Sequence, residues 1–359
     1  MKFVDEYRKK DLILSLAEKL KSVSAKEMVF MEVCGGHTMA IHRFGLGSLL
    51  PANIRLVSGP GCPVCVSSQQ FIDKAVEYSR LRGVIIATYG DLIRVPGSKT
   101  SLERERASGS DIRIIYSVLE AVEIALKNPR KKTIFLGIGF ETTAPSSAAA
   151  IIKAKKESIS NFFVLSAHKV MPPVMKALVK DGVRINGFIA PGHVTAITGT
   201  SMYEELPSVH GLGVVVSGFE PADLMQSVLM LATQVESGSP KVEIQYGRVV
   251  SKEGNTFAGK IMNEVFECRD DNLRGLGIIP DSGLRIRHAY ASFDAERQFN
   301  VNVGESVEPE GCICGDILRG LKTPPDCRLF ARKCTPSDPV GACMVSGEGT
   351  CSTYYKYRA

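Results

Sequence analysis

Residues 28–38 have the sequence MVFMEVCGGHT, an apolar run that passes directly into Cys34, two glycines and His37. The run from Met28 to Val33 has little polar alternation, which is typical of a strand covered on both faces. The same design recurs through the first two-thirds of the chain. Seven more apolar runs predict strands, over residues 54–58, 84–88, 112–116, 134–138, 162–165, 185–190 and 214–217.

Amphipathic stretches separate these strands and predict helices over residues 67–81, 117–127, 146–156 and 222–236. A strand followed by a helix, repeated, predicts an α/β protein with parallel sheets. Nearly every strand runs into a loop that contains Gly, Pro, Cys or His. Because ligands bind beyond the carboxyl ends of parallel strands, we expect these loops to line one cleft between two similar halves.

The composition is that of a folded protein without nucleic-acid or membrane partners. Of its 359 residues, 44% are hydrophobic and 23% charged, which allows two or three domains. The net charge of +6 is spread along the chain rather than gathered in a basic tract. The N-terminus lacks the apolar core of a signal peptide, and no apolar run reaches the roughly 20 residues that cross a bilayer. We therefore expect a cytoplasmic location.

The sequence predicts two parallel-sheet α/β domains plus a smaller, irregular C-terminal iron–sulfur region. The first domain spans residues 1–128 and contains the loops of Cys34 and of Cys62 and Cys65. The second spans residues 129–236. The stretch SGSP at 237–240 is typical of a linker and begins the third region, 237–359. Its last 50 residues are rich in Gly, Pro and Cys, a composition that suits a fold held by a metal cluster.

Six of the ten cysteines lie within 40 residues near the C-terminal end. In a reducing compartment such crowding favours metal binding over structural disulfides. Four thiolates match the four corners of a [4Fe–4S] cluster. Zinc sites use two close pairs of cysteines, and the gaps of six and eight residues after the third and fourth cysteines do not fit that rule. The sequence therefore favours a cluster over zinc at Cys312, Cys314, Cys327, Cys334, Cys343 and Cys351.

Two further motifs contain thiols. Cys62 and Cys65 form a C-x-x-C pair at a predicted helix N-terminus, where the helix dipole lowers thiol pKa values, and the pair suits redox chemistry or half of a metal site. Cys34 and His37 place a thiol and an imidazole within reach of one ion. Cys268 stands alone and is expected to be a buried free thiol.

Two polar residues follow predicted strands and are candidates for the cleft. Glu141 lies in the sequence FETT and His193 in the sequence PGH. For each, a structural polar group that is satisfied by hydrogen bonds is an equal alternative. The other histidines are expected to be structural: His42, His168, His210 and His288.

Several motifs together resemble the HypD family of hydrogenase maturation factors. They are CGGHT at 34–38, GPGCPVC at 59–65, GFETTAP at 139–145, PGHV at 191–194 and the six-cysteine tail. They occur in the family's order over almost the whole chain. The resemblance implies a [4Fe–4S] protein on which the Fe(CN)₂CO unit of [NiFe]-hydrogenases is assembled. It also implies a complex with the small chaperone HypC, cyanide delivery by HypE, and the hydrogenase large subunit as a further partner.

The same resemblance implies roles for individual residues. Cys34 matches the ligand of a transient Fe(II) that carries cyanide and carbon monoxide, shared with the N-terminal cysteine of the small partner. Cys62 and Cys65 match a thiol pair that works with the cluster in redox chemistry. Three more residues match family positions tied to this cleft, namely His37, His193 and Glu348.

The tail also resembles the catalytic subunit of ferredoxin:thioredoxin reductase, in which four cysteines hold a cluster and two form a nearby disulfide. By order along the chain, this likeness implies that Cys314 and Cys351 are the adjacent pair. The implied cluster ligands are then Cys312, Cys327, Cys334 and Cys343.

Three functions remain open from the sequence. The first is an assembly scaffold with electron-transfer activity, so that the term enzyme does not clearly apply. The second is a cluster-dependent thiol–disulfide oxidoreductase that acts on a protein disulfide, which leaves Cys34, His37 and His193 without a role. The third is a zinc-stabilised binding module.

Overall fold

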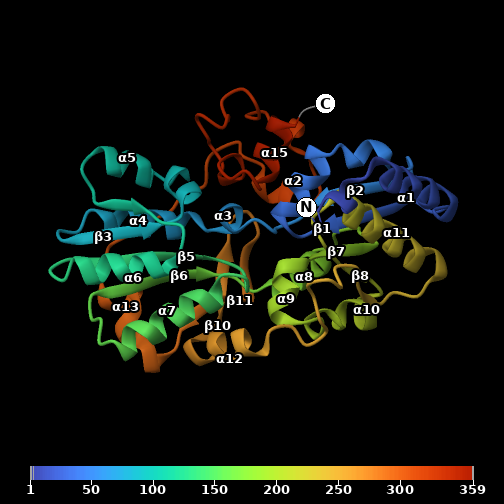
Figure 1. Ribbon diagram of the computed structural model, residues 1–359. Coiled ribbons are helices and arrows are strands. Elements are labelled where there is room, and N and C mark those ends of the chain that lie inside the picture. The colour runs from blue at the N-terminus through green and yellow to red at the C-terminus, as the bar shows by residue number, and fades with distance from the viewer. Residues whose placement is uncertain (1, 3, 358–359) are drawn as a thin grey trace.

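The computed structural model describes residue 2 and residues 4–357. Two parallel sheets stand side by side, and the cysteine-rich C-terminal region lies above the junction between them in Figure 1. The expected fold class is confirmed: a mixed α/β protein with two parallel sheets and a small C-terminal region that carries cysteines.

The first sheet has five parallel strands. Val, Ile and Phe fill its central strands, whose side chains are buried on both faces. Its order is β2 (Ile54–Ser58), β1 (Met28–Glu32), β7 (Gly187–Pro191), β8 (Gly213–Ser217) and β9 (Val242–Ile244). Around it pack α1 (Lys10–Val23), α2 (Gly35–Arg43), α9 (Gly192–Thr198), α10 (Glu205–His210) and α11 (Pro221–Ser237).

The second sheet has four parallel strands, in the order β4 (Ile112–Ile114), β3 (Val84–Thr88), β5 (Lys132–Gly139) and β6 (Phe162–His168). Its helices are α4 (Gln69–Ser79), α5 (Leu102–Ala107), α6 (Val118–Lys127) and α7 (Ala144–Lys156). Ser68, Ser101 and Ser117 cap the first three of these helices, each by accepting a backbone N–H in the first turn. The next helix, α8 (Met171–Lys180), packs against the long strand β11 (Gly277–Ile286).

The two sheets do not follow the predicted boundaries at residues 128 and 236. Strands β3 and β5 pair with each other although they lie on either side of residue 128. Strand β9 lies beyond residue 236 and still completes the first sheet. The chain leaves the first sheet after β2, builds the whole second sheet, and returns at β7. The local pattern of apolar residues predicts where a strand lies. It does not predict which strands pair, because pairing depends on contacts between residues that are distant in the sequence.

An antiparallel hairpin links the sheets to the C-terminal region. It consists of β10 (Phe266–Leu273) and β11, follows α12 (Thr256–Val265), and precedes α13 (Ala295–Gln298). Beyond it the chain contains few regular elements, namely α14 (Cys314–Leu318), η6 (Pro324–Asp326), η7 (Ala342–Met344) and α15 (Thr350–Lys356). The remaining short helices are η1 (Asp5–Arg8), η2 (Leu46–Leu49), α3 (Pro63–Val66), η3 (Gly90–Arg94), η4 (Ser201–Tyr203) and η5 (His288–Phe293).

The largest buried apolar cluster runs across both sheets and into the C-terminal region. It contains strand residues of each sheet, such as Ile86 and Phe188, together with four cysteines. The cysteine-rich region therefore packs against the common core. Within the described part of the chain, no helix combines the length and the apolar character needed to cross a membrane.

Candidate functional site

Cys34 lies between β1 and α2, where the extended backbone turns into the helix. Its φ of −149° and ψ of 123° are those of a strand, and the helix begins at the next residue. The Thr38 N–H donates to the Cys34 carbonyl at 3.1 Å. The Thr38 hydroxyl donates to Oε1 of Glu32 at 2.7 Å, below the same turn. These bonds hold Cys34 at the carboxyl end of a central strand.

The loop that contains the C-x-x-C pair crosses directly behind Cys34. Gly61 lies so close that an added Cβ would be 2.2 Å from the Cys34 nitrogen and 2.3 Å from the Val33 carbonyl carbon. Both are backbone atoms, which cannot rotate away. Glycine is therefore required at position 61 by the close approach of two chain segments.

The two glycines after Cys34 have the same role toward other segments. A Cβ on Gly35 would lie 2.6 Å from Cβ of Glu348, a residue of the C-terminal region. A Cβ on Gly36 would lie 3.2 Å from the ring of Phe219, which follows strand β8. The glycine-rich motifs thus let three distant segments contact the Cys34 turn.

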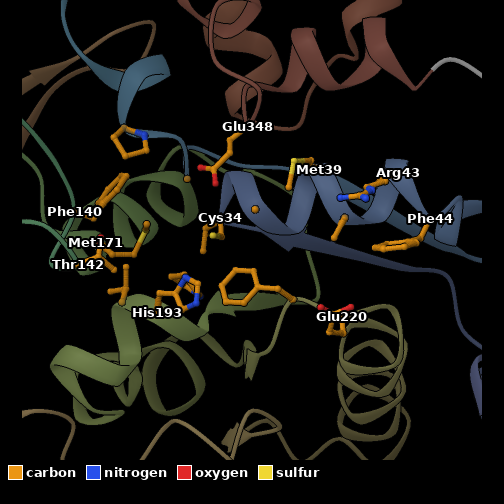
Figure 2. A pocket seen from close by; sticks show the side chains of 18 of the residues that line it. Cys34, Met39, Arg43, Phe44, Phe140, Thr142, Met171, His193, Glu220 and Glu348 are labelled. Atoms are coloured by element: carbon orange, nitrogen blue, oxygen red, sulfur yellow. The ribbon is translucent and has the colours of Figure 1, made fainter. Parts of the chain in front are cut away.

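A cleft of about 500 Å³ opens at Cys34 between the two sheets. Figure 2 shows Cys34 near its centre, with His193 below it and the Glu348 carboxylate pointing toward it from the C-terminal region. Loops that follow strands of both sheets form its walls, as expected for ligand sites at strand ends. The lining residues include Gly61, Pro63, Phe140, Thr142, Met171, Pro191 and Phe219, together with Arg8, Met39, Arg43, Phe44 and Glu220.

Burial and negative charge hold the Cys34 thiol in its protonated form. Burial, and secondly the nearby Glu348 carboxylate, raise the pKa of Cys34 to about 12. Burial, and secondly Asp91, also raise the pKa of Glu348. Cys34 therefore carries its proton at neutral pH and must lose it when it binds a metal ion.

Phe219 separates the two predicted site histidines. Its ring stacks on His193 with centroids 4.1 Å apart and lies 4.7 Å from the ring of His37. His193 lines the cleft, whereas His37 is buried behind Phe219, and neither of its ring nitrogens has a hydrogen-bond partner. Burial lowers the pKa of His37 to about 4 and also lowers the pKa of His193. Both imidazoles are therefore neutral at physiological pH and able to act as metal ligands.

Glu141 turns away from the cleft, although its neighbours Phe140 and Thr142 line it. Its Oε1 accepts the Met171 N–H at 2.9 Å, at the start of α8. The next two residues of α8 are prolines, which have no N–H to offer, and Oε2 is left without a partner. Burial raises the pKa of Glu141 to about 7. The contact is that of a helix cap.

The C-x-x-C pair is buried. Cys62 precedes α3 and is 4% exposed, and Cys65 is fully buried within it. The expected lowering of thiol pKa by a helix dipole is wrong for Cys65, whose pKa is raised well above its ordinary value by burial and by its contacts with neighbouring thiols. The helix has only four residues, too few for a strong dipole. The Cys65 thiol hydrogen-bonds with the thiols of Cys343 and Cys62.

The six C-terminal cysteines line one small cavity together. Two of their sulfur atoms are in contact: Sγ of Cys314 lies 3.0 Å from Sγ of Cys343. Cys343 therefore touches both Cys314 and Cys65, whereas the sequence-based pairing of Cys314 is with Cys351. Among the described residues, no three His, Cys, Asp or Glu side chains already converge on a site for a single metal ion.

Comparison with known proteins identifies the family. A family model described as "HypD: Hydrogenase formation hypA family" matches residues 10–358. The chain belongs to the HypD family. The hydrogenase maturation factor HypD2 of Bradyrhizobium diazoefficiens is 45% identical over 99% of this chain and 97% of its own length. The hydrogenase maturation factors HypD of Azotobacter vinelandii and Cupriavidus necator are 43% and 44% identical, each over 99% of this chain and 97% of the relative.

The HypD cleft gathers most, but not all, of the residues predicted from the sequence. Cys34, His193 and Glu348 line it, His37 lies one ring behind, and Glu141 lies outside it. Cys268, expected to be buried, is exposed on β10. His168 is buried between the hydroxyls of Ser147 and Ser166, a structural contact as expected.

Sequence reasoning missed residues that connect the segments of the HypD site. Phe219 gives no local signal beyond its place after a strand, since aromatic residues are common in cores. Arg94 donates to the Pro336 and Val345 carbonyls and so anchors the C-terminal region to η3. Arg274, in the β10–β11 turn, is 2% exposed, which is rare for arginine and visible only in the fold.

Proposed function

We propose that this protein holds an iron ion through the Cys34 thiolate while cyanide and carbon monoxide ligands are added to it, as a scaffold in [NiFe]-hydrogenase maturation. Hydrogenase maturation itself follows from membership of the HypD family. The iron with its diatomic ligands is the cargo of this site. The proposed partners are the small chaperone HypC, which supplies a second thiolate, HypE, which delivers cyanide, and the hydrogenase large subunit as recipient.

The observation that carries the proposal is the position of Cys34. Among the described residues it is the only cysteine that lines the 500 Å³ cleft, and it faces open space together with neutral His193 and with Glu348. A single protein thiolate leaves the other coordination positions of an iron ion open. Those open positions are what addition of small ligands and a partner's thiolate requires.

The residues around Cys34 support binding of a cation that displaces a proton. The thiol, with its pKa near 12, releases its proton when the sulfur binds iron. His193 and Glu348 line the same cleft and can accept that proton. Phe219 and Phe140 cover the cleft with apolar surface, which limits the access of water to the bound ion.

The C-terminal cysteines suit a [4Fe–4S] cluster, because all six thiols face one cavity and the donor set there is entirely sulfur. The ligands of such a cluster point at four separate corners, whereas two thiols in contact with each other are placed to form a disulfide. The contact between Cys314 and Cys343 therefore favours these two as the redox pair. The proposed ligands are then Cys312, Cys327, Cys334 and Cys351. When bound, a cluster of this kind supplies and accepts single electrons.

The contacts between thiols support an exchange path from the cysteine cavity toward the cleft. In the proposed exchange, the Cys343 thiolate attacks Cys65 of a Cys62–Cys65 disulfide, and Cys62 leaves as a thiolate that takes up a proton. Cys314, after losing a proton, attacks Cys343 and releases Cys65, which is protonated in turn. Two electrons and two protons thus pass to the Cys62–Cys65 pair, and a Cys314–Cys343 disulfide forms.

The same contacts are the one observation that favours a thiol–disulfide oxidoreductase. The burial of the four thiols argues against an external protein disulfide as substrate. Each of them is at most 6% exposed, namely Cys62, Cys65, Cys314 and Cys343. A pair that attacks a separate protein needs one accessible thiol. Exchange within the protein is therefore the better supported role.

An infrared spectrum of the anaerobically purified complex with HypC and HypE tests the scaffold. We expect bands of iron-bound cyanide and carbon monoxide in the wild type and in Cys268→Ala, which removes an exposed thiol on β10. We expect their loss in Cys34→Ala. A Cys34→Ala protein that still shows both sets of bands contradicts the proposal.

A further inference from the structure

A second cavity, of about 220 Å³, lies against α2 on a different face from the central cleft. Thr38, Ile41 and His42 contribute the wall that α2 forms. Met39 and Arg43, which belong to the same helix, line the cleft instead. Because side chains three and four residues apart share a helix face, α2 separates the two spaces.

The second cavity contains a buried carboxylate. Along β1, the side chains of Met28, Phe30 and Glu32 alternate onto the same face of the sheet. The first two belong to the apolar core, whereas the third is a carboxylate that is 1% exposed and lines the cavity. Oε1 of Glu32 accepts the Thr38 hydroxyl at 2.7 Å, and Oε2 is buried with no hydrogen-bond partner. Such burial is costly unless a donor or a cation faces the free oxygen.

The other walls of the cavity suit a cation that carries an alkyl chain. Ser58 pairs with Glu32 in the register of β1 and β2, so its side chain lies next to the carboxylate. The rings of His42 and Tyr354 are 4.2 Å apart and form one side of the cavity, where α15 meets α2. Aromatic faces attract cations. The remaining walls are largely apolar, with contributions from Ile41, Leu50, Ile54, Leu56 and Val57.

The donor set favours an organic cation over a metal ion. Within the described part of the chain, no three His, Cys, Asp or Glu side chains converge on a site for a single metal ion. Burial lowers the pKa of His42, so its ring is neutral at physiological pH and adds no competing charge. Arg55 also lines the cavity, but it is exposed, so solvent and salt weaken its repulsion of a second cation.

We propose that the cavity between Glu32 and Tyr354 binds a primary ammonium group on a short alkyl chain. The ammonium donates to Oε2 of Glu32 and to the Ser58 hydroxyl, and the alkyl chain packs against the apolar walls. The group belongs either to a free small amine or to a lysine side chain of another protein. The site is separate from the proposed iron site, although Thr38 connects them, since its N–H donates to the Cys34 carbonyl at 3.1 Å.

Methyl NMR of the full-length protein, purified anaerobically and labelled at the Ile δ1 methyl groups, tests the proposal. We expect n-butylammonium to shift the signals of Ile41 and Ile54, which line the cavity, and to leave that of Ile151 in α7 unchanged. The neutral analogue n-butanol should bind about tenfold more weakly or worse, because it lacks the charge-assisted hydrogen bond. Nα-acetyl-lysine methylamide distinguishes the two sources: binding at the same methyl groups indicates a lysine side chain, and its exclusion indicates a free amine.

Glu32→Gln keeps an acceptor for the Thr38 hydroxyl and removes the negative charge. We expect it to raise the dissociation constant of n-butylammonium about tenfold or more. Glu27→Gln is the matched control, because Glu27 is an exposed carboxylate just before β1, and its dissociation constant should stay within about twofold of the wild type.

Three results overturn the proposal. The first is wild-type affinity for n-butylammonium in Glu32→Gln. The second is equal affinity of the wild type for n-butanol and n-butylammonium, a comparison that needs no variant and decides if Glu32→Gln does not fold. The third is the absence of any shift of Ile41 and Ile54 in the wild type up to about 100 mM n-butylammonium. None of these results bears on iron binding at Cys34.

Discussion

The central cleft and the cysteine-rich C-terminal region are built in opposite ways. The cleft is open, contains one thiol, and is held by loops at the ends of parallel strands, whose backbone bonds fix Cys34 in place. The C-terminal region has few regular elements, and its six thiols face a small cavity. The first arrangement is held by the protein's own backbone hydrogen bonds. The second, in the proposed function, needs its cluster in order to be stable.

Removal of the cluster gives the largest expected difference between the two regions. We expect an anaerobic chelator to raise amide hydrogen exchange over residues 312–351 by about a hundredfold or more, because a region held by metal ligands opens when they are released. Exchange in strands β1, β5 and β7 should change little. Mass spectrometry of peptides from both regions measures this. Equal protection before and after iron loss would show that the C-terminal region folds without a cluster.

The next effect acts on the cleft, through the loop that contains the C-x-x-C pair. Gly61→Ala places a Cβ 2.2 Å from the Cys34 backbone nitrogen, and neither segment can move without disturbing a sheet. We expect a loss of about 3 kcal/mol or more in the free energy of unfolding, at the upper end for overpacking. Denaturant unfolding measures it.

Gly47→Ala is the control for that substitution, since a Cβ there meets no atom within 4 Å. Its unfolding free energy should lie within about 0.5 kcal/mol of the wild type. If Gly61→Ala is tolerated, the C-x-x-C loop and the Cys34 turn approach each other less closely than the structure indicates. The cleft is then held less rigidly than its backbone contacts suggest.

The sequence predicted the cleft better than it predicted the cysteine cavity, for a physical reason. Apolar runs such as residues 28–33 and 214–217 mark strands locally, and parallel strands bring their carboxyl ends to one edge, so Cys34 and His193 could be placed in one cleft. No comparable rule relates thiols along an irregular chain. The order of the cysteines therefore suggested Cys351 as the partner of Cys314, whereas the folded chain brings Cys343 to it.

Other features could not be predicted because they depend on contacts between segments that are distant in the sequence. The pairing of β3 with β5 and of β8 with β9 overrode the predicted domain boundaries, because a sheet is assembled from distant strands. Phe219 came to lie between His37 and His193 only because β8 is adjacent to β7. Glu141 follows a strand as Cys34 does, but its carboxylate accepts a hydrogen bond from the Met171 N–H at the start of α8 and does not line the cleft.

The smallest expected effect is a change in the pH dependence of stability at Glu141. This residue belongs to the fold behind the cleft and does not line the cleft itself. Burial raises its pKa from the ordinary 4.5 to about 7 in the folded protein, so the folded state holds a proton that the unfolded state has already lost. Its stabilising contribution is complete below about pH 4.5 and is lost as the pH rises toward about 7. Glu141→Gln should therefore reduce the fall in unfolding free energy over this range by up to about 3 kcal/mol.

Denaturant unfolding of the apoprotein at several pH values between about 5 and 8 measures that slope, with Glu123→Gln on the exposed face of α6 as the control. Glu32, whose pKa burial raises to about 8, contributes in the same direction and should leave part of the slope in place. Because Glu141 does not face the cleft, Glu141→Gln should also keep the infrared bands that Cys34→Ala loses. Loss of the bands with an unchanged slope would place the Glu141 carboxylate at the iron, and would move this residue from the fold to the site.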